Sequence, residues 1–219
     1  QKDLGRLKIE VARELVERIN PSAKVEIRSE SVLYSSTVKR LADVDWIFSC
    51  TDTQGSRSIL NQFAYQFLIP VIDMGSVIVA TAGHVSDIYG RTTMLVPGLG
   101  CLMCGPLLSP EKVRVDLLSE DERRRDPYVV GAKEPAPAVI SLNATVSSMA
   151  VTMFLASAIG VPSEARSINY NAITGMTRAA SITANPNCYV CSPRGIFARG
   201  DTFAAPGRMA CEAFPTKNE

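Results

Sequence analysis

Four of the six cysteines in this 219-residue chain form two pairs with the same spacing. The pairs are Cys101 with Cys104 and Cys188 with Cys191. This C-x-x-C spacing lets two thiolates bind one metal ion from a single tight turn, and two such turns complete a tetrahedral site of four sulfurs. Because such a site keeps no open coordination position, we expect a structural Zn²⁺ that ties the middle of the chain to its C-terminal part.

The cysteine content alone also allows a secreted protein with disulfide bonds. Such proteins are usually small and rich in cysteine, so a metal site in a cytoplasmic protein is the favoured interpretation. Cys50 lies in an apolar segment, and we expect it to be a small core residue. Cys211 has no pair of basic neighbours that would activate its thiol, which favours a free surface cysteine.

The composition is that of an ordinary globular protein, with 46% hydrophobic and 21% charged residues. The 23 basic and 22 acidic residues leave a net charge of +1, which gives no basic surface for nucleic acid. The longest apolar stretches are too short or too interrupted to span a membrane. The chain opens on Gln1 and continues directly into a helical pattern without the features of a signal peptide, so we expect it to start in mid-protein.

The first half of the chain predicts a strand, a helix and a second strand in succession. Apolar residues four positions apart predict an earlier helix, which Asn20 and Pro21 end. The expected elements are a helix over 5–20 and a half-buried strand over 24–32, then a buried strand over 44–50, a helix over 54–68 and a strand over 69–74. The strand–helix–strand order predicts an α/β fold with a Rossmann-like, doubly wound, mostly parallel sheet.

The second half predicts an antiparallel extension of this sheet. Short β-branched runs between glycines over 77–96, and an alternating pattern over 167–183, favour antiparallel strands. The charged, proline-rich stretch 117–137 is expected to be a solvated loop or a mobile cover for a site. An apolar helix over 139–159 should be mostly buried. We divide the chain into a domain over 1–192 and a loosely attached tail over 193–219.

Polar residues at two places have the types needed for phosphate chemistry. Asp52 follows a buried strand at the edge where parallel sheets bind ligands, and a carboxylate there suits a hard cation; it could also cap the next helix. Lys8 opens a helix, whose N-terminal N–H groups favour an anion, or it is a solvated lysine. Arg57 and Asn61 lie one turn apart on one helix face, although Arg57 could be exposed and Asn61 structural. Asp73, at the next strand end, is a weaker candidate.

Several segments, taken together and in order, resemble the ThiF/HesA/MoeB family, the bacterial relatives of ubiquitin-activating enzymes. The matching segments are residues 3–12, 19–21, 49–61 and the two cysteine pairs. The resemblance implies an adenylyltransferase that joins ATP to the C-terminal carboxylate of a ubiquitin-like protein or peptide, giving an acyl-adenylate and pyrophosphate. It further implies a homodimer.

The resemblance also implies roles for individual residues. Lys8 matches the family's adenylation lysine, and Asp52 matches the aspartate that holds Mg²⁺ near the phosphates. Arg57 matches a position near the nucleotide or the incoming substrate tail, and Asn61 a further position of the nucleotide site. The family usually has an asparagine where this chain has Thr53, so a contact through that amide is in doubt.

Two expected features are missing from this sequence. The family's glycine-rich phosphate-binding turn would precede Lys8, so we expect the C-terminal portion of a longer enzyme, inactive by itself. The interval between the cysteine pairs contains no cysteine, which disfavours a thioester intermediate.

His84 is the only histidine and has no partner for triad chemistry. The alternatives are a non-catalytic, zinc-stapled scaffold or the inactive subunit of a heterodimeric activator; a nicotinamide-dependent oxidoreductase lacks a visible acid–base pair.

Overall fold

The computed structural model describes residues 3–81, 84–126, 129 and 139–208. The chain divides into two compact units, Gln1–Ser31 and Val32–Glu219. The first unit contains α1 (Lys8–Ile19), which ends at Asn20 as the sequence predicts. The prediction of a strand over 24–32 is wrong, since these residues belong to no strand of the structure. Their alternating pattern therefore does not correspond to a place in the sheet.

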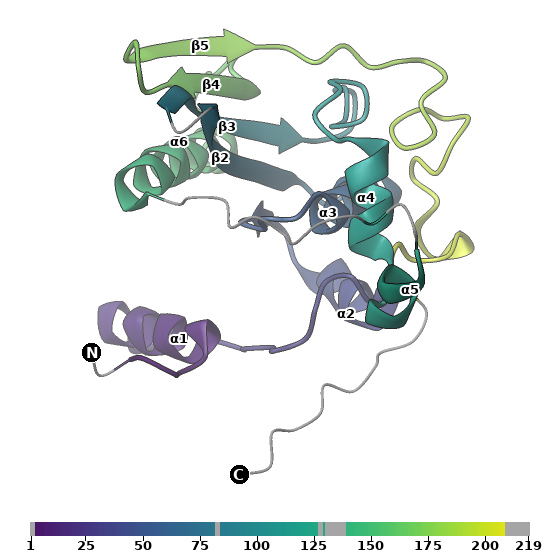
Figure 1. Ribbon diagram of the computed structural model, residues 1–219, viewed down its shortest axis with the longest axis horizontal. Coiled ribbons are helices and arrows are strands. Elements are labelled where there is room, and N and C mark those ends of the chain that lie inside the picture. The colour runs from purple at the N-terminus through teal and green to yellow at the C-terminus, as the bar shows by residue number, and fades with distance from the viewer. Residues whose placement is uncertain (1–2, 82–83, 127–128, 130–138, 209–219) are drawn as a thin grey trace. The chain divides into compact units, whose positions relative to one another are not determined.

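The second unit is built on a five-stranded sheet in the order β1-β2-β3-β4-β5 (Figure 1). Its strands are β1 (Ile47–Ser49), β2 (Val71–Thr81), β3 (His84–Leu95), β4 (Ser167–Asn171) and β5 (Met176–Ala180). β1 and β2 pair in parallel, and the other three pairings are antiparallel. The α/β fold with an antiparallel extension is confirmed. The extension is larger than expected, since only one pairing of the described sheet is parallel.

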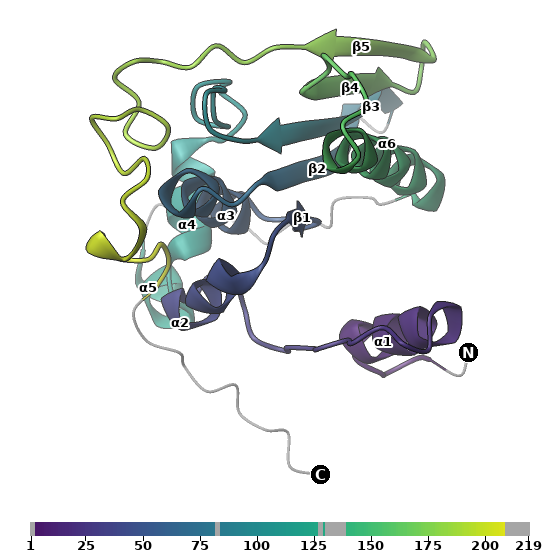
Figure 2. The same cartoon turned by 180° about the vertical axis from the view of Figure 1, so that it is seen from behind.

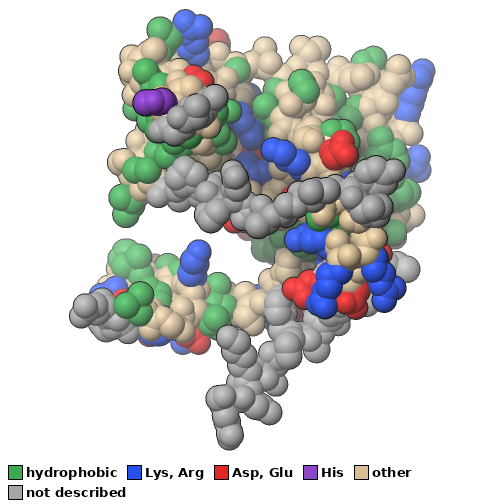
Figure 3. Space-filling model, in the orientation of Figure 1, with side chains coloured by type: hydrophobic (Ala, Val, Ile, Leu, Met, Phe, Trp, Pro, Cys, Tyr) green, Lys and Arg blue, Asp and Glu red, His purple; other side chains and the backbone are tan. Residues whose placement is uncertain are grey.

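Helices cover the sheet on both faces at the end near β1. The helices of this unit are α2 (Ser35–Lys39), η1 (Arg40–Asp43), α3 (Gln54–Phe67), α4 (Pro110–Leu117), α5 (Glu120–Arg125), α6 (Ile140–Ala158) and η2 (Gly200–Thr202). Val71 and Leu95 pack with α3, whereas Ile72 and Met94 pack with α6. Because successive side chains of a strand point to opposite faces, α3 and α6 lie on opposite sides of the sheet. Figure 2 shows α6 in front of the strands, and Figure 3 looks onto the other face.

Helix α6 corrects the prediction of a mostly buried helix. Only Leu142, Val146, Ala150 and Met153 are buried, at the spacing of a single helix face. Val151 and Leu155 on the outer side are 47% and 48% exposed. The helix is long and apolar enough to meet the length and composition test for a membrane-spanning segment, although one face packs on the sheet. The expectation that the chain binds no membrane stays a prediction.

Two further segments are more ordered than the sequence suggested. The stretch from 117 to 126, expected as part of a solvated loop, includes α5, which begins with a capping box between Ser119 and Glu122. Residues 193–208, expected to attach loosely, pack against the rest of the unit. Ile196 is 1% exposed within the core beside α3, and the amide of Gln66 donates to the carbonyl oxygens of Gly200 and Phe203. The division at residue 192 stays a prediction.

Candidate metal centre and sheet-edge site

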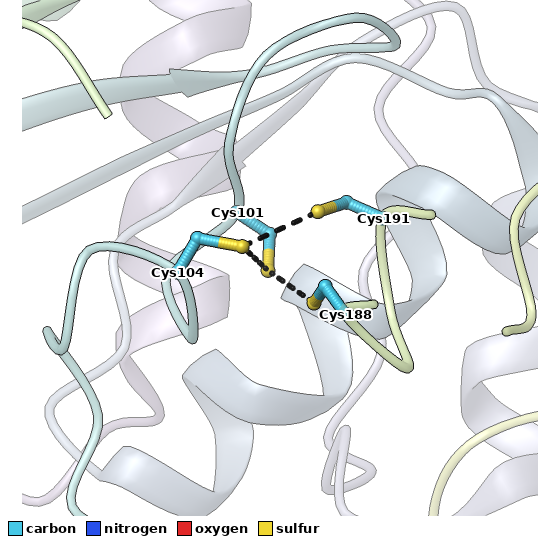
Figure 4. Close-up of side chains that lie close together, drawn as sticks. All are labelled: Cys101, Cys104, Cys188 and Cys191. Atoms are coloured by element: carbon cyan, nitrogen blue, oxygen red, sulfur yellow. Dashed lines mark hydrogen bonds between the residues drawn. The ribbon is translucent and has the colours of Figure 1, made fainter. Parts of the chain in front are cut away.

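The two cysteine pairs come together in one cluster. The four sulfur atoms lie within 4.8 Å of one another (Figure 4). The sulfur of Cys101 is 3.8 Å from that of Cys104 and 3.6 Å from that of Cys188, and the sulfurs of Cys104 and Cys191 are 3.5 Å apart. Four sulfurs around one Zn²⁺ at about 2.3 Å would be about 3.8 Å apart at tetrahedral angles. The predicted cluster is confirmed, and its donor set fits a tetrahedral metal.

Tight turns present each cysteine pair. The backbone N–H of Gly105 donates to the carbonyl oxygen of Cys101, and that of Ser192 donates to Cys188 in the same way. At Gly195 a β-carbon would lie 1.8 Å from the carbonyl oxygen of Tyr189, so only glycine lets the chain pass this close. These turns fix the backbone from which all four sulfurs point inward.

Helix α3 supports the first of these turns. Asn61 is fully buried, and its Oδ1 accepts a hydrogen bond of 2.8 Å from the N–H of Leu102, between the two cysteines of the first pair. Tyr65, one turn later, donates its hydroxyl hydrogen to the carbonyl oxygen of Leu99 at 3.0 Å. The sequence left Asn61 between a nucleotide contact and a structural role. In the structure its enclosed side chain holds the cysteine turn.

The electrostatic setting of the cluster differs from one sulfur to the next. Burial raises the pKa of the Cys101 thiol to about 11. Burial also acts to raise the pKa of Cys104, but hydrogen bonds, including one of 3.4 Å from the N–H of Asn185, outweigh it and lower this pKa to about 7. Burial and the four nearby sulfurs raise the pKa of Tyr65. The loop around Asn185 therefore favours a thiolate, the form that binds metal.

Asp52 lies at the carboxyl end of β1 with its side chain exposed. The residue that caps α3 is Thr53, whose Oγ1 accepts from the N–H of Ser56 at 3.3 Å. Asp52 is therefore not the capping residue, and its carboxylate stays available to solvent or a ligand. Thr53, which stands where the family usually has asparagine, is the N-cap of α3.

Arg57 is held in a charged cluster beside this strand end. Its Nη1 donates to both carboxylate oxygens of Asp73, at 3.0 and 2.9 Å, and its Nη2 donates to the carbonyl oxygen of Met74. Asp73 also accepts from Ser49, at the end of β1, and from Arg91 on β3 at 2.7 Å. Sequence reasoning missed Arg91, because no local pattern shows which residues of β3 lie within reach of Asp73.

Four further residues were singled out in the sequence. Lys8 opens α1 in the first unit, and its role stays a prediction. Cys50 was expected in the core, but it is exposed and lies one residue beyond the end of β1. His84 is exposed at the start of β3. Cys211 lies outside the described residues.

Comparison with known proteins gives a family and a fold. The ThiF family model matches residues 1–190. The adenylyltransferase and sulfurtransferase UBA4 of Meyerozyma guilliermondii is 32% identical over 69 residues, which cover 32% of this chain and 16% of that protein.

The similar solved structures include E. coli MccB with MccA-N7isoASN, at 15% identity and a TM-score of 0.66, over 88% of this chain and 54% of that one. E. coli MccB with ATP is also 15% identical, with a TM-score of 0.60, over 87% of this chain and 52% of that one. The structure of PaaA matches at 14% identity with a TM-score of 0.52, over 83% of this chain and 57% of that one. These likenesses show the fold, and the chain spans about half the length of the solved structures it matches.

Proposed function

Because this chain belongs to the ThiF family, whose members are adenylyltransferases, we propose that it takes part in ATP-dependent adenylation of a C-terminal carboxylate. In this reaction a carboxylate oxygen of the substrate attacks the α-phosphorus of ATP. The new bond joins that oxygen to phosphorus, and the bond to the leaving pyrophosphate breaks. The products are an acyl-adenylate and pyrophosphate.

The observation that carries the proposal is the exposed, non-capping position of Asp52. Its carboxylate is exposed at the carboxyl end of β1, and Thr53 rather than Asp52 caps the following helix. Ligands of open α/β sheets bind at this strand edge. Asp52 would hold Mg²⁺, which would neutralise phosphate charge when bound. Lys8 would contribute a second positive charge at the phosphates, where charge develops during the reaction.

The acyl substrate is the C-terminus of a ubiquitin-like protein or of a peptide. UBA4 is an adenylyltransferase and sulfurtransferase, and MccB has been solved with ATP and with MccA. Both substrate classes end in a carboxylate, so one chemistry serves either. We further propose that the four cysteines hold a structural Zn²⁺ and that the enzyme works as a homodimer. The inactivity expected for this chain by itself stays a prediction.

Exchange of labelled pyrophosphate into ATP tests the proposal, with the longest natural form of the protein. The assay is run with a panel of purified ubiquitin-like proteins and short peptides, each with a free C-terminal carboxylate. We expect exchange with one member of the panel. Asp52→Asn and Lys8→Ala should each reduce it by about 100-fold or more, since each removes charge stabilisation at the phosphates.

Asp45→Asn and Lys24→Ala are matched controls, because both side chains are exposed and each belongs to the same compact unit as the residue it is compared with. Both should exchange at the rate of the unmodified protein. Full activity in the Asp52 and Lys8 variants would reject their roles. Absence of exchange with every substrate would favour the alternative, a non-catalytic scaffold or inactive subunit of a heterodimeric activator.

A further inference from the structure

The face of the sheet turned away from α6 carries a row of polar residues. In the register of the strands, Asp73 faces Thr93, Gly75 faces Arg91, and Arg91 faces Asn169. These residues share one face, because Met74 and Met94, which alternate with them, pack against α6. Figure 3 shows Lys or Arg atoms at the surface over the middle of this face.

Two arginines on this face share one buried carboxylate. The side chain of Asp73 is 1% exposed, and those of Arg57 and Arg91 are 14% and 16% exposed. Asp73 accepts hydrogen bonds from both arginines and from Ser49, so its oxygens are already satisfied. Two guanidinium groups and one carboxylate leave one uncompensated positive charge. Partial burial weakens the screening of that charge by water, so a second anion is attracted more strongly here than at an open surface.

The arginines are held in place and still have donors to offer. Nη1 of Arg91 donates to Thr93 at 2.7 Å and Nη2 donates to Asp73. Among the described residues these bonds use two of the five N–H groups of its guanidinium. Arg57 passes directly over Gly75, where a β-carbon would lie 2.4 Å from its Nη2. A side chain at residue 75 would therefore displace the guanidinium group of Arg57 from its present position.

This cluster lies at the proposed reaction edge. Ser49, which donates to Asp73 at 3.2 Å, is the last residue of β1, and Asp52 follows it in the loop. Planar guanidinium groups bind carboxylate and phosphate oxygens in a bidentate manner. We propose that Arg91, positioned by Asp73, joins Arg57 in binding one oxyanion of the adenylation reaction. That oxyanion is either the terminal carboxylate of the acyl substrate or a phosphate of the nucleotide. The inference rests on the proposed function only for the identity of its ligand.

Binding of two small probes to the full chain tests the site without turnover. N-acetylglycine presents a terminal carboxylate, with N-acetylglycinamide as its uncharged control; AMP presents a phosphate, with adenosine as its control. The readout is the NMR signal of the arginine Nε–H groups during titration. We expect a saturable shift with one of the two anions and none with the matched uncharged compound, and the responding anion identifies the source of the oxyanion.

Arg91→Gln should weaken that binding about tenfold or more, which corresponds to about 1.4 kcal/mol. Arg57 still neutralises Asp73 in this variant, so we expect it to fold. Gly75→Ala provides a second variant, because it displaces Arg57 without removing a charge, and it should also weaken binding. Arg178→Gln is the control, because Arg178 is exposed on β5. This variant should bind the probe as the unmodified chain does.

Equal affinity in Arg91→Gln and Arg178→Gln would overturn the inference, and so would the absence of a shift with both anions. The proposed function fails separately. A protein that binds the probe through Arg91 but never exchanges pyrophosphate retains the site and refutes the reaction. In an active enzyme, Arg91→Gln should raise the KM of the one substrate that carries the bound oxyanion, and unchanged KM values for both substrates would refute the site alone.

Discussion

Asn61 accepts a hydrogen bond of 2.8 Å from the backbone N–H of Leu102, which lies between Cys101 and Cys104. Asn61 belongs to α3, the helix that begins directly after Asp52 and Thr53. One helix therefore contacts the cysteine cluster with its middle and starts at the proposed nucleotide edge. We therefore expect the proposed metal centre to stabilise the sheet edge through α3.

Replacing Asn61 with alanine should destabilise the fold and weaken metal binding. The N–H of Leu102 is enclosed in the core, and losing its acceptor costs about 1–3 kcal/mol. Urea unfolding measures this loss, and Ser58→Ala, one turn earlier on the same helix, is the control. If Asn61→Ala and Ser58→Ala unfold at the same urea concentration, Asn61 does not support the turn.

One equivalent of zinc per chain is expected in the purified protein. Cys188→Ser should abolish this content and lower the unfolding temperature, because a tetrahedral site loses one of its four ligands. Elemental analysis of the acid-released metal gives the stoichiometry. Cys50→Ser should retain the full equivalent, since Cys50 lies outside the cluster. An unchanged zinc content in Cys188→Ser would show that the cysteine cluster does not bind the zinc.

Gln66→Ala should release the segment around residues 200–204. The buried amide of Gln66 donates to the carbonyl oxygens of Gly200, Phe203 and Ala204, and without it each of these oxygens loses one hydrogen-bond donor. We expect faster hydrogen exchange over this segment and a loss of about 1–3 kcal/mol in unfolding free energy. Ser58→Ala, two turns earlier on the same helix, should leave exchange there unchanged. Equal protection in the two variants would show that the segment is held by other contacts.

Much of the architecture could be predicted because its signals are local. The cysteine spacing specified the cluster, since each turn is encoded within four residues. Helix α3 and strand β2 appeared as helical periodicity and a short apolar run. The exposed state of Cys50 was missed because β1 ends at Ser49, one residue earlier than the apolar run suggests.

The long-range features could not be obtained from such patterns. Arg91 meets Asp73 only through the register of an antiparallel pair, which no local sequence signal specifies. In α6, the apolar residues Val151 and Leu155 on the outer side hide the helical periodicity, so a helix with one buried face looked wholly buried. The capping box of α5 was present in the sequence as Ser119 and Glu122, and that local signal could have been used.

The most direct test of the account is chemical trapping of the acyl-adenylate. The longest natural form of the protein is incubated with ATP, Mg²⁺, hydroxylamine and each carboxylate-terminated substrate of the panel, and the substrates are analysed by mass spectrometry. Hydroxylamine attacks the activated carbonyl and releases AMP, so we predict a hydroxamate at the C-terminus of one substrate, dependent on ATP and absent with Asp52→Asn. Unmodified C-termini throughout the panel, or a hydroxamate formed equally well by Asp52→Asn, would contradict the account.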